Sequence, residues 1–400
     1  MARVKVAALA LMVIGCLARP ASAGPVSMWD FTVFSAGGAA FNAQSNPETR
    51  LGVDVIVNGL VGSNQDMLMV GGATVVASGV YVGGYLDMGT EARIGNSTTM
   101  AEVVVNGVNP EVGSPGVFEA QINGDIYGNL FVTGDVQLQS YADIRKVGGV
   151  GGNVEYTGTY DTNGSPTVEG TVSLVGSTQQ FSLITIPGAT NFDANVGTLV
   201  TDDRSCTGAC TSLVLAPGSY RDLDIGSSKS LYLTAGDYYF NTINVNSDLM
   251  LYLDVTGGPI NIYVLGIANF GSNQTSMVKG TGTGGNYVLL SAAPDLAAYI
   301  YLETKNKFNV NSGTQWAGTV FASQFEANGA DETYVGQNIT WWGAIYAFDS
   351  LDIHQGSTVN YVRSYLAPNG PTAVPEPSSL LLLGGGLLAV GRVVRRRKRN

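Results

Sequence analysis

Hydrophobic and polar residues alternate in many short stretches of this chain, and the clearest of these are residues 243–245, 249–255 and 260–264. Successive side chains of a β-strand point to opposite faces, so this two-residue period predicts half-buried strands. Gly, Asn, Ser and Thr separate the stretches and predict turns. No long apolar pattern with a helical period occurs between residues 24 and 371. The sequence therefore predicts an all-β body.

The strand pattern also repeats along the chain. In the first half, apolar residues followed by glycine recur with their last glycines 13, 12, 11 and 12 residues apart, at Gly59, Gly72, Gly84, Gly95 and Gly107. In the second half, Leu223, Ile243 and Ile262 are separated by 20 and 19 residues. This repetition favours a β-solenoid, a right-handed β-helix-like stack of short strands with two strands in each turn of about 20 residues. The alternative is a pair of β-sandwich lobes.

The body divides where the glycine units stop. Residues 24–176 form a Gly-rich β-repeat lobe, residues 181–367 form a second solenoid lobe, and residues 368–373 form a linker. The two lobes are compatible with one continuous stack. The ends of a solenoid expose strand edges that need protection, and the aromatic residues 29–34 are predicted to form the N-terminal cap.

The chain begins with the features of a secretory signal peptide. Arg3 and Lys5 provide a positive start, and residues 6–17 are apolar. The small residues Ala21 and Ala23 then predict a single cleavage site, after which the mature chain starts at Gly24. Residues 13–16, which end in Cys16, offer a lipid-modification site as an alternative. The chain is expected to be exported.

The C-terminus predicts a second membrane-directed segment. Residues 380–394 are apolar but contain three consecutive glycines, and six basic residues lie within the last nine positions. Sixteen helical residues from Ser379 span roughly 24 Å, which is short of a hydrocarbon core of about 30 Å. We expect a short transmembrane helix that holds the chain transiently, with its basic end in the cytoplasm.

This tail resembles the PEP-CTERM sorting signal over residues 374–400. The three parts of that signal are present in order: Pro375, Glu376 and Pro377, then the apolar segment, then Arg395, Arg396 and Arg397. The resemblance implies recognition by an exosortase, which is a membrane protease, and delivery to the cell surface or extracellular matrix. An ordinary single-span anchor is the alternative.

The body resembles the choice-of-anchor A class of bacterial surface proteins. The resemblance rests on residues 31–34, 57–84, 216–220, 236–240 and 343–347. It implies a structural protein associated with extracellular polymer, and it brings no catalytic motif.

Charge narrows the range of partners. Nine of the 20 basic residues lie in the first 23 and last nine positions, so the body carries only 11 bases against all 31 acids. Phosphate contacts need a basic surface, so nucleic acid is excluded as an expected partner.

Few residues suggest chemistry. Cys206 and Cys210 are expected to form a disulfide in an exported chain. His354 is the only histidine, and it is predicted to share a solvent-facing side with Asp352. Asp222 with Asp224, and Asp202 with Asp203, are carboxylate pairs that are expected to be solvated, with calcium binding or acid–base catalysis as alternatives.

Tyr232, Tyr252 and Tyr263 are predicted on outer faces about one turn apart, as a cross-strand ladder or a platform for sugars. We therefore expect a non-enzymatic structural or adhesive protein of the exopolysaccharide or biofilm matrix, without a cofactor. The alternatives are a carbohydrate-active β-helix enzyme that uses Asp carboxylates and a calcium-dependent glycan-binding module.

Overall fold

The computed structural model describes residues 27–368, apart from 37–48, 76–78, 108–117, 181, 185–186, 188, 194, 196–202 and 324–332. The predicted signal peptide and the predicted tail helix both lie outside the described residues. So do the residues of the predicted cleavage site and sorting signal, which are Ala21, Ala23, Gly24, Pro375, Glu376, Pro377, Arg395, Arg396 and Arg397.

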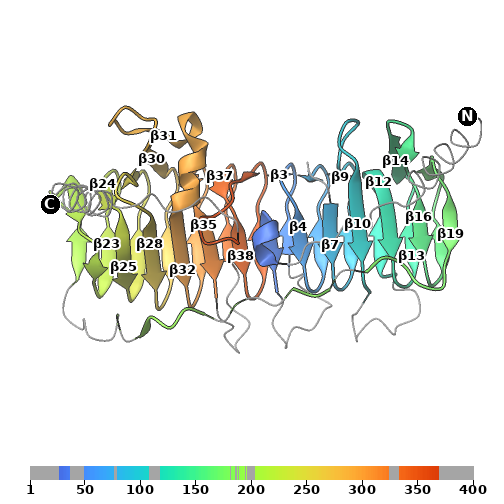
Figure 1. Ribbon diagram of the computed structural model, residues 1–400, viewed down its shortest axis with the longest axis horizontal. Coiled ribbons are helices and arrows are strands. Elements are labelled where there is room, and N and C mark those ends of the chain that lie inside the picture. Colours follow the sequence, from blue (N-terminus) through green and yellow to red (C-terminus); the bar gives the residue numbers. More distant parts are fainter. Residues whose placement is uncertain are drawn as a thin grey trace, which may run out of the picture.

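The described chain winds through three parallel sheets, A, B and C, and visits them in that constant order (Figure 1). In the order of stacking, sheet A contains β22 (Gly218–Ser219), β25 (Gly236–Phe240), β28 (Ile260–Val264), β32 (Ile300–Thr304), β35 (Thr319–Ala322), β38 (Ile345–Ala347), β1 (Val33–Ser35), β4 (Val61–Ser63), β7 (Gly79–Val82), β10 (Ala101–Val105), β12 (Asp125–Val132), β16 (Val154–Tyr156) and β19 (Val172–Leu174).

Sheet B contains β20 (Arg204–Cys206), β23 (Asp222–Ile225), β26 (Thr242–Val245), β29 (Ala268–Phe270), β33 (Phe308–Val310), β36 (Thr333–Val335), β39 (Leu351–Ile353), β2 (Thr49–Leu51), β5 (Met67–Met69), β8 (Leu86–Met88), β11 (Ala120–Ile122), β13 (Val136–Leu138) and β17 (Tyr160–Thr162).

Sheet C contains β21 (Ser212–Leu215), β24 (Ser230–Thr234), β27 (Met250–Asp254), β30 (Thr275–Lys279), β34 (Gln315–Ala317), β37 (Thr340–Gly343), β40 (Thr358–Tyr361), β3 (Ile56–Asn58), β6 (Thr74–Val75), β9 (Arg93–Ile94), the first part of β12, β14 (Asp143–Val147) and β18 (Thr167–Val168). Short additions are β15 (Val150–Gly151), β31 (Val288–Leu289), η1 (Met28–Asp30), η2 (Leu290–Ala292) and η3 (Pro294–Tyr299).

We number the thirteen turns of the described stack as rungs 1 to 13, from β20 to β19. Inward side chains of all three sheets, mostly Val, Ile, Leu and Met, form one continuous core. The all-β prediction is confirmed, and the parallel pairing is that of a solenoid. The prediction of two strands per turn is wrong, because each turn has three. Some of these strands are only two residues long, too short to show a period.

The two ends of the described chain meet in the middle of the stack. Strand β1 pairs on one edge with β38 and on the other with β4. Rung 7 therefore takes its sheet-A strand from the start of the body and its other two strands, β39 and β40, from the end. The chain winds from rung 7 to rung 13, returns to rung 1, and winds back to rung 7, as the colours of Figure 1 show.

This arrangement corrects the predicted cap. Residues 29–34 lie at the central seam rather than at an end of the stack, since β1 has a partner on both edges. Phe31 and Phe34 are fully buried, with ring centroids 4.9 Å apart. These aromatic rings pack between the two halves of the stack and do not protect an edge.

The return from rung 13 to rung 1 runs along the outside of sheet A. We call the described residues within 175–203 the strap. Asn64 in rung 8 exchanges two hydrogen bonds with the backbone of Ile184, of 2.7 and 2.9 Å. Further along, the Thr190 amide and hydroxyl donate to the two carboxylate oxygens of Glu303 in rung 4, at 2.7 and 2.6 Å.

The strap and η1 cover a second apolar cluster on the outer face of sheet A. Its buried members are Met28, Phe31, Phe34, Tyr81, Val104, Phe131, Ile184, Tyr301, Phe321, Ala344 and Tyr346. Sheet A thus carries apolar side chains on both faces, and the outer cluster extends across the seam. The strap joins the two halves by packing as well as by covalent connection.

The corners from sheet B to sheet C are nearly uniform. Eleven of the thirteen described corners contain four residues: 52–55, 70–73, 89–92, 139–142, 163–166, 226–229, 246–249, 271–274, 311–314, 336–339 and 354–357. In nine of them the third residue has a positive φ, which favours Gly, Asn and Asp. The exceptions are residues 207–211, a five-residue corner, and residues 123–124, a two-residue corner.

We predict that Phe34→Ala destabilises the whole stack, because it removes a fully buried ring at the seam. The expected loss is about 3–5 kcal/mol in the free energy of unfolding, measured by denaturant titration. Val214→Ala is the matched control, since Val214 is 70% exposed, and it should change little. Equal midpoints for Phe34→Ala and the parent would contradict the role of the seam.

Candidate functional site

The segment that leads to the tail is held against the body. After β40, the Val362 amide donates to Gly343 at 3.3 Å and the Tyr365 amide donates to Ala298 at 2.9 Å. The Tyr365 hydroxyl donates to Asn261 Oδ1 at 2.5 Å. These contacts fix residues 362–368 on the sheet-A side of rungs 3 to 6, so the described chain ends beside these rungs and not at an end of the stack.

The start of the body lies beside this segment. Ser27 and Asp30 form a reciprocal cap around η1. The Tyr361 hydroxyl donates to the Trp29 carbonyl at 2.5 Å, and the Trp29 and Tyr346 rings meet edge to face at 5.5 Å. We call residues 27–31 the entry of the body and residues 361–368 its exit. These contacts make the entry and the exit neighbours.

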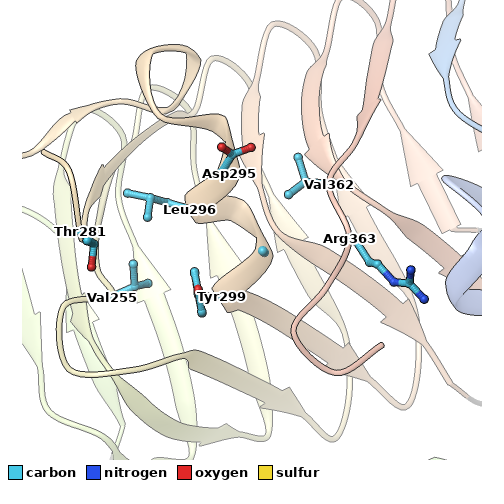
Figure 2. Close-up of a pocket in the computed structure, with 8 residues that line it drawn as sticks. Val255, Thr281, Asp295, Leu296, Tyr299, Val362 and Arg363 are labelled. Carbon is cyan, nitrogen blue, oxygen red and sulfur yellow. The ribbon is translucent and has the colours of Figure 1, made fainter. Parts of the chain in front are cut away.

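A groove of about 420 Å³ adjoins the exit (Figure 2). The short helix η3 forms one wall through Leu296 and Tyr299, and Val362 lies on the opposite side. Asp295 and Arg363 are the charged residues of its lining. This mostly apolar lining suits packing of chain or ligand.

Burial governs the electrostatics of the exit. Desolvation raises the pKa of Tyr365 to about 12, the hydrogen bond with Asn261 opposes this shift, and the charge of Asp237 adds to it. Desolvation also raises the pKa of Tyr361. Both hydroxyls therefore stay neutral and donate hydrogen bonds at ordinary pH.

The segment that follows the exit is the one that the comparisons identify. Residues 373–398 match the PEP-CTERM protein-sorting motif. The sorting signal predicted over residues 374–400 is thus confirmed as a motif, and the match includes Pro375, Glu376 and Pro377. A PEP-CTERM motif marks a protein for export to the cell surface and supports processing by an exosortase. No significant match was found among curated proteins or among solved structures.

Among the helices in the described part of the chain, none is long and apolar enough to cross a membrane.

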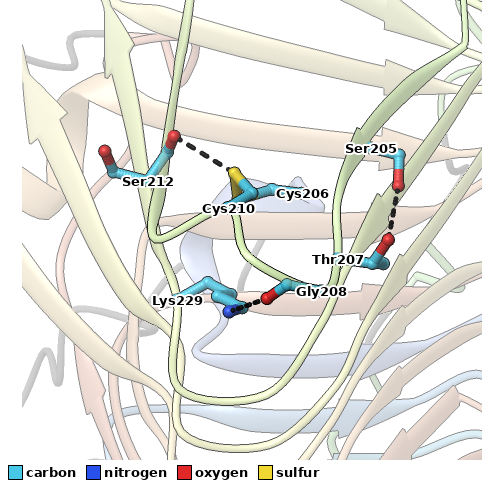
Figure 3. The surroundings of a disulfide bond; sticks show 7 residues. All are labelled: Ser205, Cys206, Thr207, Gly208, Cys210, Ser212 and Lys229. Carbon is cyan, nitrogen blue, oxygen red and sulfur yellow. Dashed lines mark hydrogen bonds between the residues drawn. A yellow bond between two sulfur atoms is a disulfide. The ribbon is translucent and has the colours of Figure 1, made fainter.

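The cysteine pair closes the five-residue corner of rung 1 (Figure 3). Cys206 and Cys210 are joined as a disulfide, with Cα atoms 5.2 Å apart. Lys229 of the next rung donates to the Gly208 carbonyl at 2.9 Å, so the loop is also tied to its neighbour. The disulfide tightens the longest of the described B-to-C corners, in one of the two rungs at the ends of the stack.

The candidate carboxylates Asp203 and Asp222 take part in ion pairs and hydrogen bonds, and Arg221 pairs with both of them. Asp222 accepts from Thr242 at 2.7 Å and from Asn241 at 3.1 Å, and Asp203 pairs with Arg221. Asp224 is exposed on β23, and Asp202 lies outside the described residues. No group of three or more His, Cys, Asp or Glu side chains in the described ranges is placed to hold a metal ion.

His354 lies near the seam on the outer face of sheet B. Its Nε2 is 2.9 Å from Asp352 Oδ2, which also lies 3.2 Å from Arg50 Nη1. Asp352 is only 7% exposed, so the expectation that it faces solvent is wrong. The reason is that Asp352 pairs across the strands with Arg50 and lies beside Tyr334.

The tyrosines form ladders on two different sheets. Tyr232 and Tyr252 stack on sheet C with ring centroids 4.3 Å apart and an angle of 4°. Tyr263 belongs instead to sheet A, where it stacks on Tyr239 at 5.1 Å. The stacked rings cover each other's faces, while Tyr287 packs against Tyr232 and Tyr252, and Phe192 packs against Tyr263. This geometry supports the predicted ladder for Tyr232 and Tyr252. The prediction that Tyr263 belongs to the same ladder is wrong.

Sequence reasoning missed the groove and the seam. Both depend on residues far apart in sequence, such as Val255 with Val362 and Trp29 with Tyr361. The one available signal was the apolar Leu296 in residues 294–299, which carry no strand alternation.

We predict that replacing Cys206 and Cys210 with serine loosens rung 1. Loss of the five-residue closure should cost roughly 2 kcal/mol in the entropic account of disulfides. Hydrogen exchange should rise over residues 204–216 and stay at the parent's level over β39 and β40, the internal control. Unchanged protection of residues 204–216 would contradict this role.

We also predict alkaline sensitivity at the exit. Below pH 10 Tyr365 is neutral in both folded and unfolded chains; between pH 10 and about 12 only the unfolded chain ionises. The free energy of unfolding therefore falls as pH rises through this window. Melting at pH 9 and pH 11.5 should show a smaller loss for Tyr365→Phe than for the parent. Tyr141→Phe, at a side chain 67% exposed, should retain the parent's loss; an equal loss in Tyr365→Phe would refute the assignment.

Proposed function

We propose that this protein is a non-enzymatic structural or adhesive component of the exopolysaccharide matrix at the cell surface. The observation that carries the proposal is a PEP-CTERM motif at residues 373–398 that follows a long solenoid body. Thirteen rungs at a strand spacing of about 4.8 Å give a rod roughly 58 Å long. Such a rod supplies extended faces for contact with polymer.

The side-chain arrangement supports a role without catalysis. Asp125 has one oxygen 3.5 Å from Arg93 and the other 3.4 Å from Arg145, so this carboxylate is engaged in ion pairs on both sides. The resemblance to choice-of-anchor A surface proteins adds to the same proposal. In this reading the tail helix holds the chain in the inner membrane until an exosortase acts on it.

The position of the exit determines how the rod would be oriented at a surface. Because residues 362–368 are fixed on the inner rungs, a tail that holds the protein at a surface attaches the rod by its side. Rung 1 and rung 13 then point away from the attachment in opposite directions, and both remain available to the surrounding polymer.

We predict that replacing Pro375, Glu376 and Pro377 with alanine keeps the protein in the membrane fraction, because the processing enzyme loses its recognition sequence. Cell fractionation with C-terminal sequencing measures the outcome. Pro371→Ala, which lies outside the matched residues, is the control and should be sorted like the parent. Normal release of the triple variant would contradict sorting by this motif.

The matrix role has its own test. Deletion of the gene should reduce matrix cohesion, measured by cell aggregation and shear release, and the full-length chain should restore it. Cohesion unchanged by the deletion would refute the proposed role.

A further inference from the structure

One rung interrupts the regular edge between sheets B and C. The register aligns Ile122 with Met88 and with Leu138, and Asp125 with Arg93 and with Asp143. The corner of rung 11 thus spans the same gap with two residues, 123–124, that rungs 10 and 12 span with four. The shortened corner is recessed between two full-length neighbours.

The short corner requires glycine. A Cβ on Gly124 would lie 2.2 Å from the Ala92 carbonyl oxygen and 3.0 Å from the Met88 methyl group. Asn123 then ties the neighbouring corners together, because its amide donates to the Thr90 hydroxyl at 2.9 Å and its carbonyl accepts from the Tyr141 amide at 3.3 Å. Gly124 and Asn123 therefore fix the shape of the recess.

The recess is an open slot of about 740 Å³. Its walls include Thr90 and Glu91 from rung 10 and Ser140 and Tyr141 from rung 12. Removal of one corner leaves a gap of about one strand spacing, roughly 4.8 Å. That gap accepts a single extended chain that crosses the edge of the stack.

A polar wall flanks the slot. Arg93 and Arg145 lie over the Tyr127 ring at 5.8 and 5.6 Å, and both pair with Asp125. Arg145 also lies 2.5 Å from Asp143. These interlocked groups are held in place before any ligand arrives, and the Arg93 side chain is still 49% exposed.

The lining has the chemistry for a polyhydroxylated ligand. Hydroxyls of Thr90 and Ser140, together with carboxylate and guanidinium groups, provide both donors and acceptors. Tyr141, 67% exposed, supplies an aromatic surface with a polar tip. Three carboxylates against two guanidinium groups give the site a negative balance, which disfavours a polyanion.

We propose that this slot binds an extended neutral polysaccharide chain. The proposal rests on the proposed matrix function and gives that function a binding site and a ligand class. Tyr141 packs against a sugar ring, and the polar wall hydrogen-bonds to its hydroxyls.

The test is affinity gel electrophoresis of the full-length chain in gels that contain hydroxyethyl cellulose, dextran or galactomannan, with polygalacturonate as the polyanion. At least one neutral polymer should retard the parent. Tyr141→Ala should weaken that retardation at least tenfold. Insertion of Ser-Gly between Asn123 and Gly124, which restores a four-residue corner, should abolish it while the melting temperature stays at the parent's value or above.

Tyr299→Ala, in the groove beside the tail, is the matched control and should bind like the parent. The proposal is overturned if no neutral polymer retards the parent, if polygalacturonate is preferred, or if both slot variants bind normally. Matrix cohesion separates the two proposals. Cohesion restored by the parent and equally by Tyr141→Ala leaves the matrix role standing and removes the slot from it, whereas cohesion unaffected by gene deletion removes the matrix role itself.

Discussion

The pairing of β1 between β38 and β4 is the constraint on which the rest of the stack depends. A rung in a solenoid is stabilised only by its neighbours, and rung 7 is complete only when both ends of the body contribute to it. Without this closure the same residues would form two shorter stacks with additional open edges. The strap makes the closure intramolecular, and Glu303 and Asn64 hold it across the outside of sheet A.

This closure separates the ends of the chain from the ends of the rod. A simple solenoid begins at one end and finishes at the other, so a terminal tether holds it upright. Here the entry and the exit meet through Tyr361 and Trp29, and the strands that terminate the rod, β19 and β20, belong to the interior of the sequence. In the proposed function, attachment beside rungs 3 to 6 leaves both ends of the rod, rung 1 and rung 13, in the polymer.

Local features of the fold were accessible from the sequence, and closure was not. Alternation located β26, β27 and β28, and the 20-residue spacing aligned Leu223 with Ile243 as the structure does. The same series failed at its third member, since Ala268 rather than Ile262 continues it. The seam joins residues about 310 positions apart, such as Phe34 and Tyr346. A local sequence pattern does not predict a pairing over that distance. Aromatic residues at 29–34 therefore suggested a cap.

Most of the described B-to-C corners have the same length, and two deviate from it. Four residues with a left-handed third position satisfy the B-to-C turn in most rungs, so neither a longer nor a shorter corner is needed to build the stack. The longer one, in rung 1, is clipped by Cys206 and Cys210, which offsets the freedom of an extra residue at an end. The shorter one has no such structural compensation to make: it demands Gly124, exposes Tyr141 and opens a polar slot. A corner that requires glycine and is held in place by Asn123 fits the proposed binding role.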